Sequence, residues 1–195
     1  MKMNSTWKTL TRDQKKSWST WAKNNAVLLP DGQFKVVAAR KAFTIVLQQR
    51  ATAGASLTPT VVPAAFSWLT GQFSLRDCGP FTTGTGYVGL RCEKNLASGT
   101  KWFIWATPPV LAGEVAPRRL FRLLKIYSPG ALTADDVTAS WHTEFRAVCG
   151  EFNGPGVDGE WPEGNEHYVW FRFCQYANGQ LGPATVGRGQ IVVEL

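Results

Sequence analysis

Residues 167–176 read His-Tyr-Val-Trp-Phe-Arg-Phe-Cys-Gln-Tyr and give the strongest strand pattern in the sequence. Successive side chains of a strand point to opposite faces, and here both faces are mostly apolar. A strand of this kind lies at the centre of a sheet and is buried on both sides. Asn178-Gly179 follows and predicts a turn. We expect residues 190–194 to form the last strand, next to the central one.

Short alternating runs precede this central strand. Residues 73–78, 87–92, 101–107 and 120–127 each combine apolar and polar positions, with Gly and Pro between them, which is typical of antiparallel β-structure. One segment breaks the pattern: Thr133 with Asp136 resembles a helix start, and apolar residues recur from Val137 to Val148 at helical spacing. We therefore predict one inserted helix at about 134–149. It is followed by a long acidic loop of Gly and Pro at 151–166.

The N-terminal segment has helical signals instead. Thr11 and Gln14 form a capping-box pattern, which predicts a helix from about residue 12 to 23. Trp18 and Trp21 lie three positions apart and share one face of it, whereas Lys15, Lys16 and Lys23 lie on the other. A turn at 29–32 leads to a second predicted helix at about 34–52, closed by Gly54.

These patterns predict an α+β, mainly β fold. Its parts are an N-terminal helical hairpin at 1–56, which we interpret as a basic docking arm, and an antiparallel β-sandwich of the fibronectin III or immunoglobulin kind at 57–195 that carries the inserted helix. Residues 55–63 are small, polar and Pro-containing, and predict the linker.

Charge is distributed unevenly. The chain has 195 residues and a net charge of +7. Residues 1–50 hold ten Lys or Arg against Asp13 and Asp31, a net charge of +8, whereas the remaining residues hold eleven basic and twelve acidic groups, a net charge of −1. A basic arm on a nearly neutral body favours an acidic partner, either protein or nucleic acid. Lys or Arg with interleaved Trp is also a nucleic-acid pattern, but the Trp spacing is better explained by a buried stripe.

The residues that usually carry chemistry do not form a convincing site. Gly84-Thr-Gly86-Tyr-Val-Gly89 fits a dinucleotide-binding expression but lacks the strand before it and the helix after it. His142, His167 and the cysteines do not have zinc-ligand spacing. We expect no enzyme activity, no metal and no cofactor. For the cysteines we expect free thiols, and the alternative is a disulfide between Cys78 and Cys92 across a hairpin.

No stretch reaches the roughly 18 apolar residues that a membrane span needs, and the first residues lack the apolar core of a signal peptide. We therefore expect synthesis in the cytosol and no membrane partner.

Several stretches resemble a known group of sequences. The pattern Trp7-x-x-Leu10-Thr11-x-x-Gln14, the run Trp105-Ala106-Thr107-Pro108-Pro109 and the run Leu132-Thr133-Ala134 are similar to uncharacterised proteins of phage and prophage-associated gene sets. The end of the chain, from Tyr168 through Asn178-Gly179 to Ile191-Val192-Val193, is similar to the last hairpin of fibronectin type III-like sandwiches. These resemblances imply a virion or assembly role with no catalytic residues.

The resulting hypothesis is a non-catalytic structural component of a phage-like virion, such as a capsid decoration, connector or tail protein. It is assembled in the host cytoplasm and binds copies of itself, as a homo-oligomer, or other virion proteins. One alternative is a nucleic-acid-binding accessory protein that uses the basic arm, and another is a cell-surface adhesion module, which a Cys78–Cys92 disulfide would favour. The residues predicted to contact a partner are Trp7, Trp18, Trp21, Lys15, Lys16, Lys23, Arg40 and Lys41.

Overall fold

The computed structural model describes residues 3–65, 68, 73–78, 88–92, 100–108, 110–111, 113, 120–128, 137–139 and 167–190. Its class is α+β, with N-terminal helices followed by antiparallel β-sheets. The helices are α1 (Met3–Thr9), α2 (Arg12–Asn24) and α3 (Ala39–Thr52), and the strands are β1 (Val27–Leu28), β2 (Phe34–Lys35), β3 (Phe73–Cys78), β4 (Val88–Cys92), β5 (Lys101–Ala106), β6 (Val110–Leu111), β7 (Arg122–Tyr127), β8 (Val137–Ala139), β9 (His167–Ala177) and β10 (Gln180–Gln190).

The chain divides into two compact units. The first consists of residues 1–68 together with 174–184, and the second of residues 69–173 together with 185–195. The first unit is therefore larger than the predicted arm at 1–56, because the linker region and the tip of the β9–β10 hairpin belong to it.

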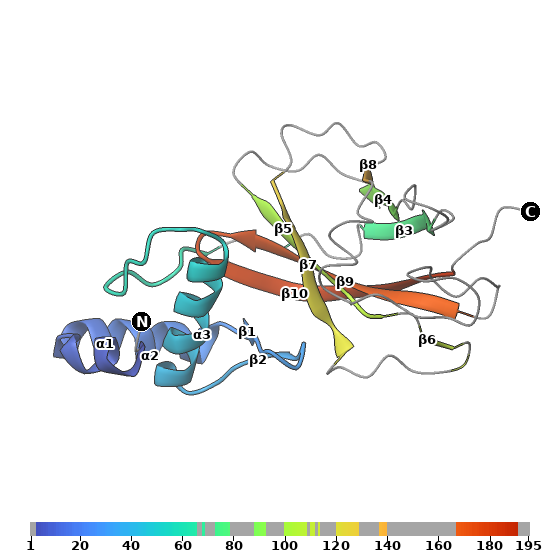
Figure 1. The fold of residues 1–195 in the computed structure, drawn as a ribbon. Coiled ribbons are helices and arrows are strands. Elements are labelled where there is room, and N and C mark those ends of the chain that lie inside the picture. The colour runs from blue at the N-terminus through green and yellow to red at the C-terminus, as the bar shows by residue number, and fades with distance from the viewer. Residues whose placement is uncertain are drawn as a thin grey trace, which may run out of the picture. The chain divides into compact units, whose positions relative to one another are not determined.

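Helix α2 begins where the sequence predicts. The backbone N–H of Gln14 donates to the Thr11 hydroxyl, and the Gln14 side chain accepts from the backbone N–H of Thr11, so the capping box is complete. Helix α1 was not expected from the sequence. Helix α3 stands across α1 and α2 in the first unit (Figure 1) and packs against both.

Helix α3 begins five residues later than the predicted start at residue 34. Phe34–Lys35 pairs instead with Val27–Leu28 as a small antiparallel hairpin, closed by a turn in which the N–H of Gly32 donates to the Leu29 carbonyl at 2.9 Å. The end of α3 agrees with the sequence: Gly54 has φ +65°, and the N–H groups of Gly54 and Ala55 donate to the carbonyls of Ala51 and Arg50. This is a Schellman motif.

The core of the first unit is made by the three helices and β1. Trp18 and Phe43 are fully buried at its centre, with their rings 5.2 Å apart in an edge-to-face arrangement. Around them lie Leu10, Trp21, Ala22, Val27, Leu29, Ala42, Ile45, Val46 and Leu47. The tryptophan stripe of α2 is thus explained by packing within the chain's own fold.

The central-strand prediction is confirmed. The largest sheet has the order β10-β9-β5-β7, with β6 paired to β9, so β9 has neighbours on both sides. Its residues 171–177 are all buried. Asn178 and Gly179 have φ of 49° and 84° and make the two-residue turn between β9 and β10, which are the long orange and red strands of Figure 1.

Two β-region predictions need correction. The neighbour of β9 starts at Gln180, directly after the turn, rather than at residue 190; residues 191–195 lie outside the described part of the chain. The inserted helix predicted at 134–149 is wrong at Val137–Ala139, which pair with Leu90–Val88 of β4 in a separate sheet of order β3-β4-β8. The β-branched Val137 and Thr138 suit that pairing. Residues 140–149 of the predicted helix, and the loop at 151–166, lie outside the described residues.

Candidate protein-binding surface

Two of the three N-terminal tryptophans, Trp18 and Trp21, are part of the core, and Trp7 packs against it. Trp18 is 0% exposed and its indole N–H donates to the Pro59 carbonyl at 3.0 Å. Trp21 is 8% exposed and lies edge-on to Trp18. Trp7 is half-buried, and the centroid of its ring lies 5.1 Å from that of the Phe43 ring. The prediction that these rings insert into a partner is therefore wrong for Trp18 and Trp21 in this fold. Trp18 already packs against Phe43 and is hydrogen-bonded to Pro59, and the buried Trp21 packs against Trp18.

The predicted basic residues stay at the surface. Lys16 and Lys23 are exposed on α2, two turns apart, and Arg40 and Lys41 are exposed in the first turn of α3. Lys15 is half-buried, and its ammonium group donates to the Lys8 carbonyl at 3.3 Å. Sequence reasoning separated the basic face from the apolar face correctly, but it assigned partner binding to both.

The charge asymmetry follows the boundary between the units. All ten basic residues of the N-terminal fifty lie in the first unit, whose acidic residues are Asp13 and Asp31. The hairpin tip at 174–184 that completes this unit adds no charged residue. A compact body with a net charge of +8 attracts acidic partners over a distance of about 10 Å at moderate salt.

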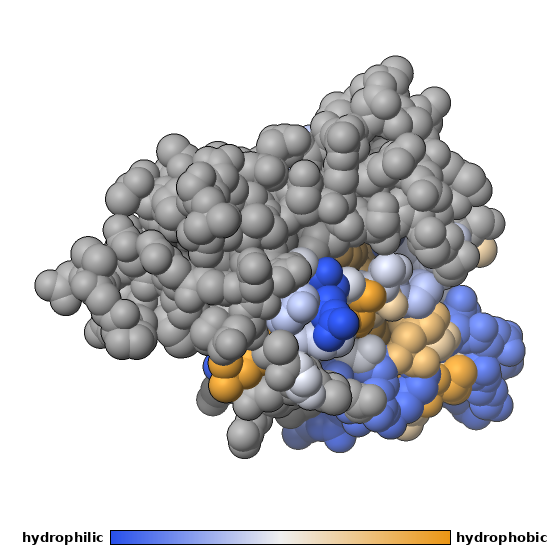
Figure 2. Space-filling model, turned by 90° about the vertical axis from the view of Figure 1, so that its right-hand side faces the viewer, coloured by the Kyte–Doolittle hydropathy of each residue, from blue (hydrophilic) through white to orange (hydrophobic). Residues whose placement is uncertain are grey.

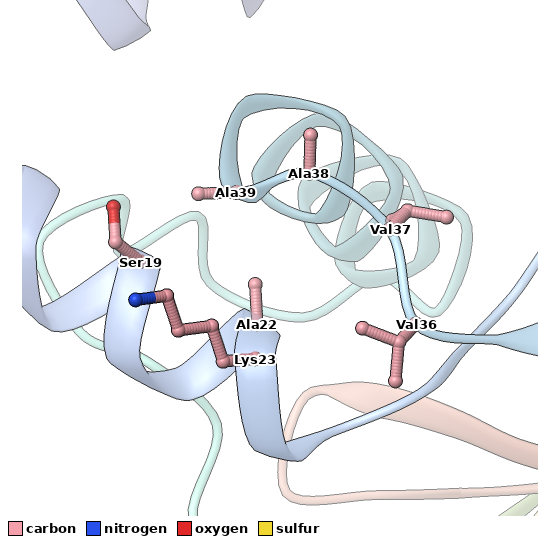
Figure 3. Close-up of a pocket in the computed structure, with 7 residues that line it drawn as sticks. All are labelled: Ser19, Ala22, Lys23, Val36, Val37, Ala38 and Ala39. Carbon is pink, nitrogen blue, oxygen red and sulfur yellow. The ribbon is translucent and has the colours of Figure 1, made fainter.

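An open groove of about 460 Å³ lies where the end of α2 meets the start of α3. Its apolar lining comes from Ala22 on α2 and from Val36–Ala39, and its polar lining from Ser19 and Lys23. Figure 3 shows Val36 directed toward Ala22, with Ser19 and Lys23 along α2. Val36 is 56% exposed, unusually high for a valine. No pattern in the sequence indicates this groove, because the late start of α3 forms it.

The groove is electropositive on one side. Among the residues that the structure describes, Lys23 is its one charged lining residue, and Ala38, the N-cap residue of α3, makes no side-chain hydrogen bond to the helix. The free N–H groups of a helix start carry a partial positive charge. Apolar lining beside positive charge fits a partner that presents an apolar side chain next to a carboxylate.

Arg50 lies in the last turn of α3, at the end of the helix away from the groove, and contacts several other segments of the first unit. Its guanidinium donates to the carbonyls of Thr58, Val61 and Gly179, at 2.9, 3.2 and 3.3 Å. Gln49 next to it donates to the Leu28 carbonyl and accepts from the N–H of Leu181. Both side chains are buried, so α3 fixes the segment after it and the hairpin tip by polar contacts as well as apolar ones.

The second unit has a row of arginines over aromatic rings. The Arg172 guanidinium lies 4.6 Å from the Trp105 ring and 5.0 Å from the Phe121 ring, and that of Arg188 lies 4.9 Å from the Tyr168 ring. Such contacts contribute about 0.5–2 kcal/mol each. The sequence placed Tyr168 and Arg172 on one face of β9, but the partners from other strands had no signal. We assign this row to sheet stability.

The two cysteines of the predicted hairpin disulfide are not opposite each other. The β3–β4 register pairs Cys78 with Val88 and Cys92 with Phe73, at the two ends of the ladder. At about 3.3 Å per residue they are about 15 Å apart, whereas bridged Cα atoms lie about 4.4–6.8 Å apart. This register contradicts a Cys78–Cys92 bond, and with it the main support for an adhesion module.

Searches of protein-family models, of curated proteins and of solved structures found no match to this chain. Within the described ranges, no cluster of three or more His, Cys, Asp or Glu side chains could hold a metal ion. Among the helices that the structure describes, none is long and apolar enough to cross a bilayer. Figure 2 shows hydrophobic residues next to strongly hydrophilic ones on the face that it presents.

Proposed function

We propose that the chain is a non-catalytic structural component of a phage-like virion, a capsid decoration, connector or tail protein that acts through protein–protein interfaces. The observation that carries this proposal is the surface of the first unit, which combines exposed lysines with a groove of apolar lining that has Lys23 at its edge. Mixed surfaces of this kind are typical of non-obligate interfaces, which bury about 1,600 Å² in total. The resemblance to phage-associated sequences supports the setting, a virion assembled in the host cytoplasm.

The mechanism that we propose differs from that of a docking arm. The helices fold as a body with their own core, so they present a finished surface instead of exposed rings. A preformed surface avoids most of the ordering cost of association. In the second unit, we propose that the sheets β10-β9-β5-β7 and β3-β4-β8 form a fibronectin-like sandwich, in line with the resemblance of the last hairpin.

The test is whether the chain is part of a particle. Particles purified on a density gradient from cells that carry the gene should contain the chain at a fixed copy number relative to the major capsid protein, measured by quantitative mass spectrometry. If the chain is abundant in the lysate but missing from every particle band, the proposal is wrong.

A second candidate function is nucleic-acid binding, which the exposed Lys16, Lys23 and Lys41 favour. Burial of Trp18 and Trp21 removes the rings that would stack on bases, so this function would depend on phosphate contacts alone. A salt titration distinguishes it, since the logarithm of a phosphate-driven affinity falls by about 0.9 per contacted phosphate for each logarithmic unit of salt.

A further inference from the structure

The groove between α2 and the start of α3 has an apolar lining with positive charge on one side. Val36 and Ala22 supply aliphatic surface, while Lys23 and the uncapped start of α3 supply the charge. The volume of about 460 Å³ lies within the range of about 300–1,000 Å³ of sites that hold a small ligand, so one aromatic side chain fits. None of the described residues that line it is acidic.

The chain itself contains a segment of complementary chemistry. Residues 151–166 hold five acidic residues and no Lys or Arg, so the segment has a net charge of −5. Within it, Glu160-Trp161-Pro162-Glu163 places an indole between two carboxylates. This is the combination that the groove requires: a large apolar group for the aliphatic lining and carboxylates for the positive side. The same segment holds five of the twelve acidic residues of the second unit.

We propose that the groove lined by Ala22, Lys23 and Val36–Ala39 binds the acidic segment 151–166 of a second copy of this chain, with Trp161 against Val36 and a neighbouring carboxylate beside Lys23. This inference rests on the proposed function, since it names one interface of the assembly. A basic site on one copy and an acidic segment on the next form a heterologous contact, which generates rings or open arrays of subunits.

The direct test is binding of a fluorescently labelled synthetic peptide of residues 151–166 to the intact protein, followed by anisotropy. An exposed ion pair changes affinity by up to about fivefold, and charge reversal removes that contribution. We therefore expect Lys23→Glu to weaken binding by about that factor and Val36→Ser to weaken it by about fivefold. Lys41→Glu is the matched control, because it makes the same charge change at an exposed site outside the groove lining, and it should change affinity by less than about twofold.

Four outcomes overturn the proposal. One is the absence of peptide binding both to the intact protein and to the Trp161→Ala variant, and another is equal weakening by Lys23→Glu and Lys41→Glu, which would indicate general charge attraction. The third is a DNA oligonucleotide of the same net charge binding with equal affinity and equal response to Lys23→Glu. If the protein is monomeric and binds peptide only after Trp161→Ala, the occupant is the chain's own segment and a second copy is excluded. In each case the particle test still decides the proposed function independently.

Discussion

Arg50 shows how one buried side chain positions a turn. Its guanidinium contacts the Gly179 carbonyl, and a Cβ added at Gly179 would collide with the same guanidinium. Gly179 also has φ +84°, which L side chains rarely adopt. Two independent constraints therefore require glycine at this position, one from the backbone and one from packing.

Gly179→Ala should therefore destabilise the protein more than Gly54→Ala does. Gly54 has a similar φ of +65° but open space around its Cβ position, so it reports the backbone cost alone, about 1–2 kcal/mol. Urea denaturation of both variants measures the difference. Equal losses of stability in the two variants would mean that the Arg50 side chain moves away from the added methyl group without cost.

Tyr176 gives the first unit a pH dependence at high pH. Burial raises the pKa of its phenol, and the positive charge of Arg50 offsets this only in part; burial likewise lowers the pKa of Arg50. A phenol whose pKa is higher in the folded than in the unfolded state stabilises the fold fully below about pH 10, the unfolded value. That contribution is lost as pH rises from the unfolded pKa through the folded pKa, because between the two values only the unfolded state has released its proton.

Tyr176→Phe should remove this contribution. The difference in unfolding free energy between the wild type and the variant should be constant below about pH 10 and should move in favour of the variant above it. Denaturation midpoints between pH 8 and 11 measure this. A difference that is flat across the whole range would show that the phenol is solvated in the folded protein.

At the scale of elements, the sequence located those helix boundaries that depend on neighbouring residues alone. The capping box at Thr11 and the Schellman motif at Gly54 involve only neighbouring residues, so the sequence reveals both. The start of α3 was misplaced because Phe34–Lys35 pairs with Val27–Leu28. That pairing is a contact between two segments of the chain. Residues 34–38 fit a helical period as well, so periodicity alone could not show that two of them form a strand.

In the β region, too, the sequence reveals local patterns but not pairing between segments. Strand β9 was recognised because the apolar residues on both of its faces indicate burial on both sides. Strand β10 was placed too late because Gly182, Pro183, Gly187 and Gly189 hide a strand that exists through its hydrogen bonds to β9. At Val137–Ala139 the pairing with β4 outweighs an apolar period that suits a helix.

Removal of the capping box tests the account of α2. Thr11→Ala should cost about 0.5–2 kcal/mol of stability, since the N–H of Gln14 loses its acceptor. Thr20→Ala, at an exposed site of the same helix, serves as the control and should be nearly neutral. Chemical denaturation followed by circular dichroism measures both. A neutral Thr11→Ala would show that the start of α2 is held by tertiary packing alone.

At the scale of the whole molecule, the sequence located the basic residues but not their relation to the aromatic ones. Trp18 was predicted both as a buried stripe and as an anchor for a partner, because periodicity shows that a face is apolar without showing what covers it. Phe43 and Pro59, which cover it, lie 25 and 41 residues further along the chain. The groove has the same origin, since its two walls meet only in the folded unit.

The first unit buries Trp18 and Trp21 by itself, without a partner. Hydrogen exchange of the Trp18 indole N–H, followed by NMR and assigned with Trp18→Phe, measures this directly. The indole donates to the Pro59 carbonyl inside the core, so its exchange should be slow and independent of protein concentration, even where the protein is monomeric. The contradicting result is exchange in dilute protein that is as fast as in a free indole, with protection only when the protein associates. Trp18 would then be covered by a partner, as the docking-arm hypothesis predicts.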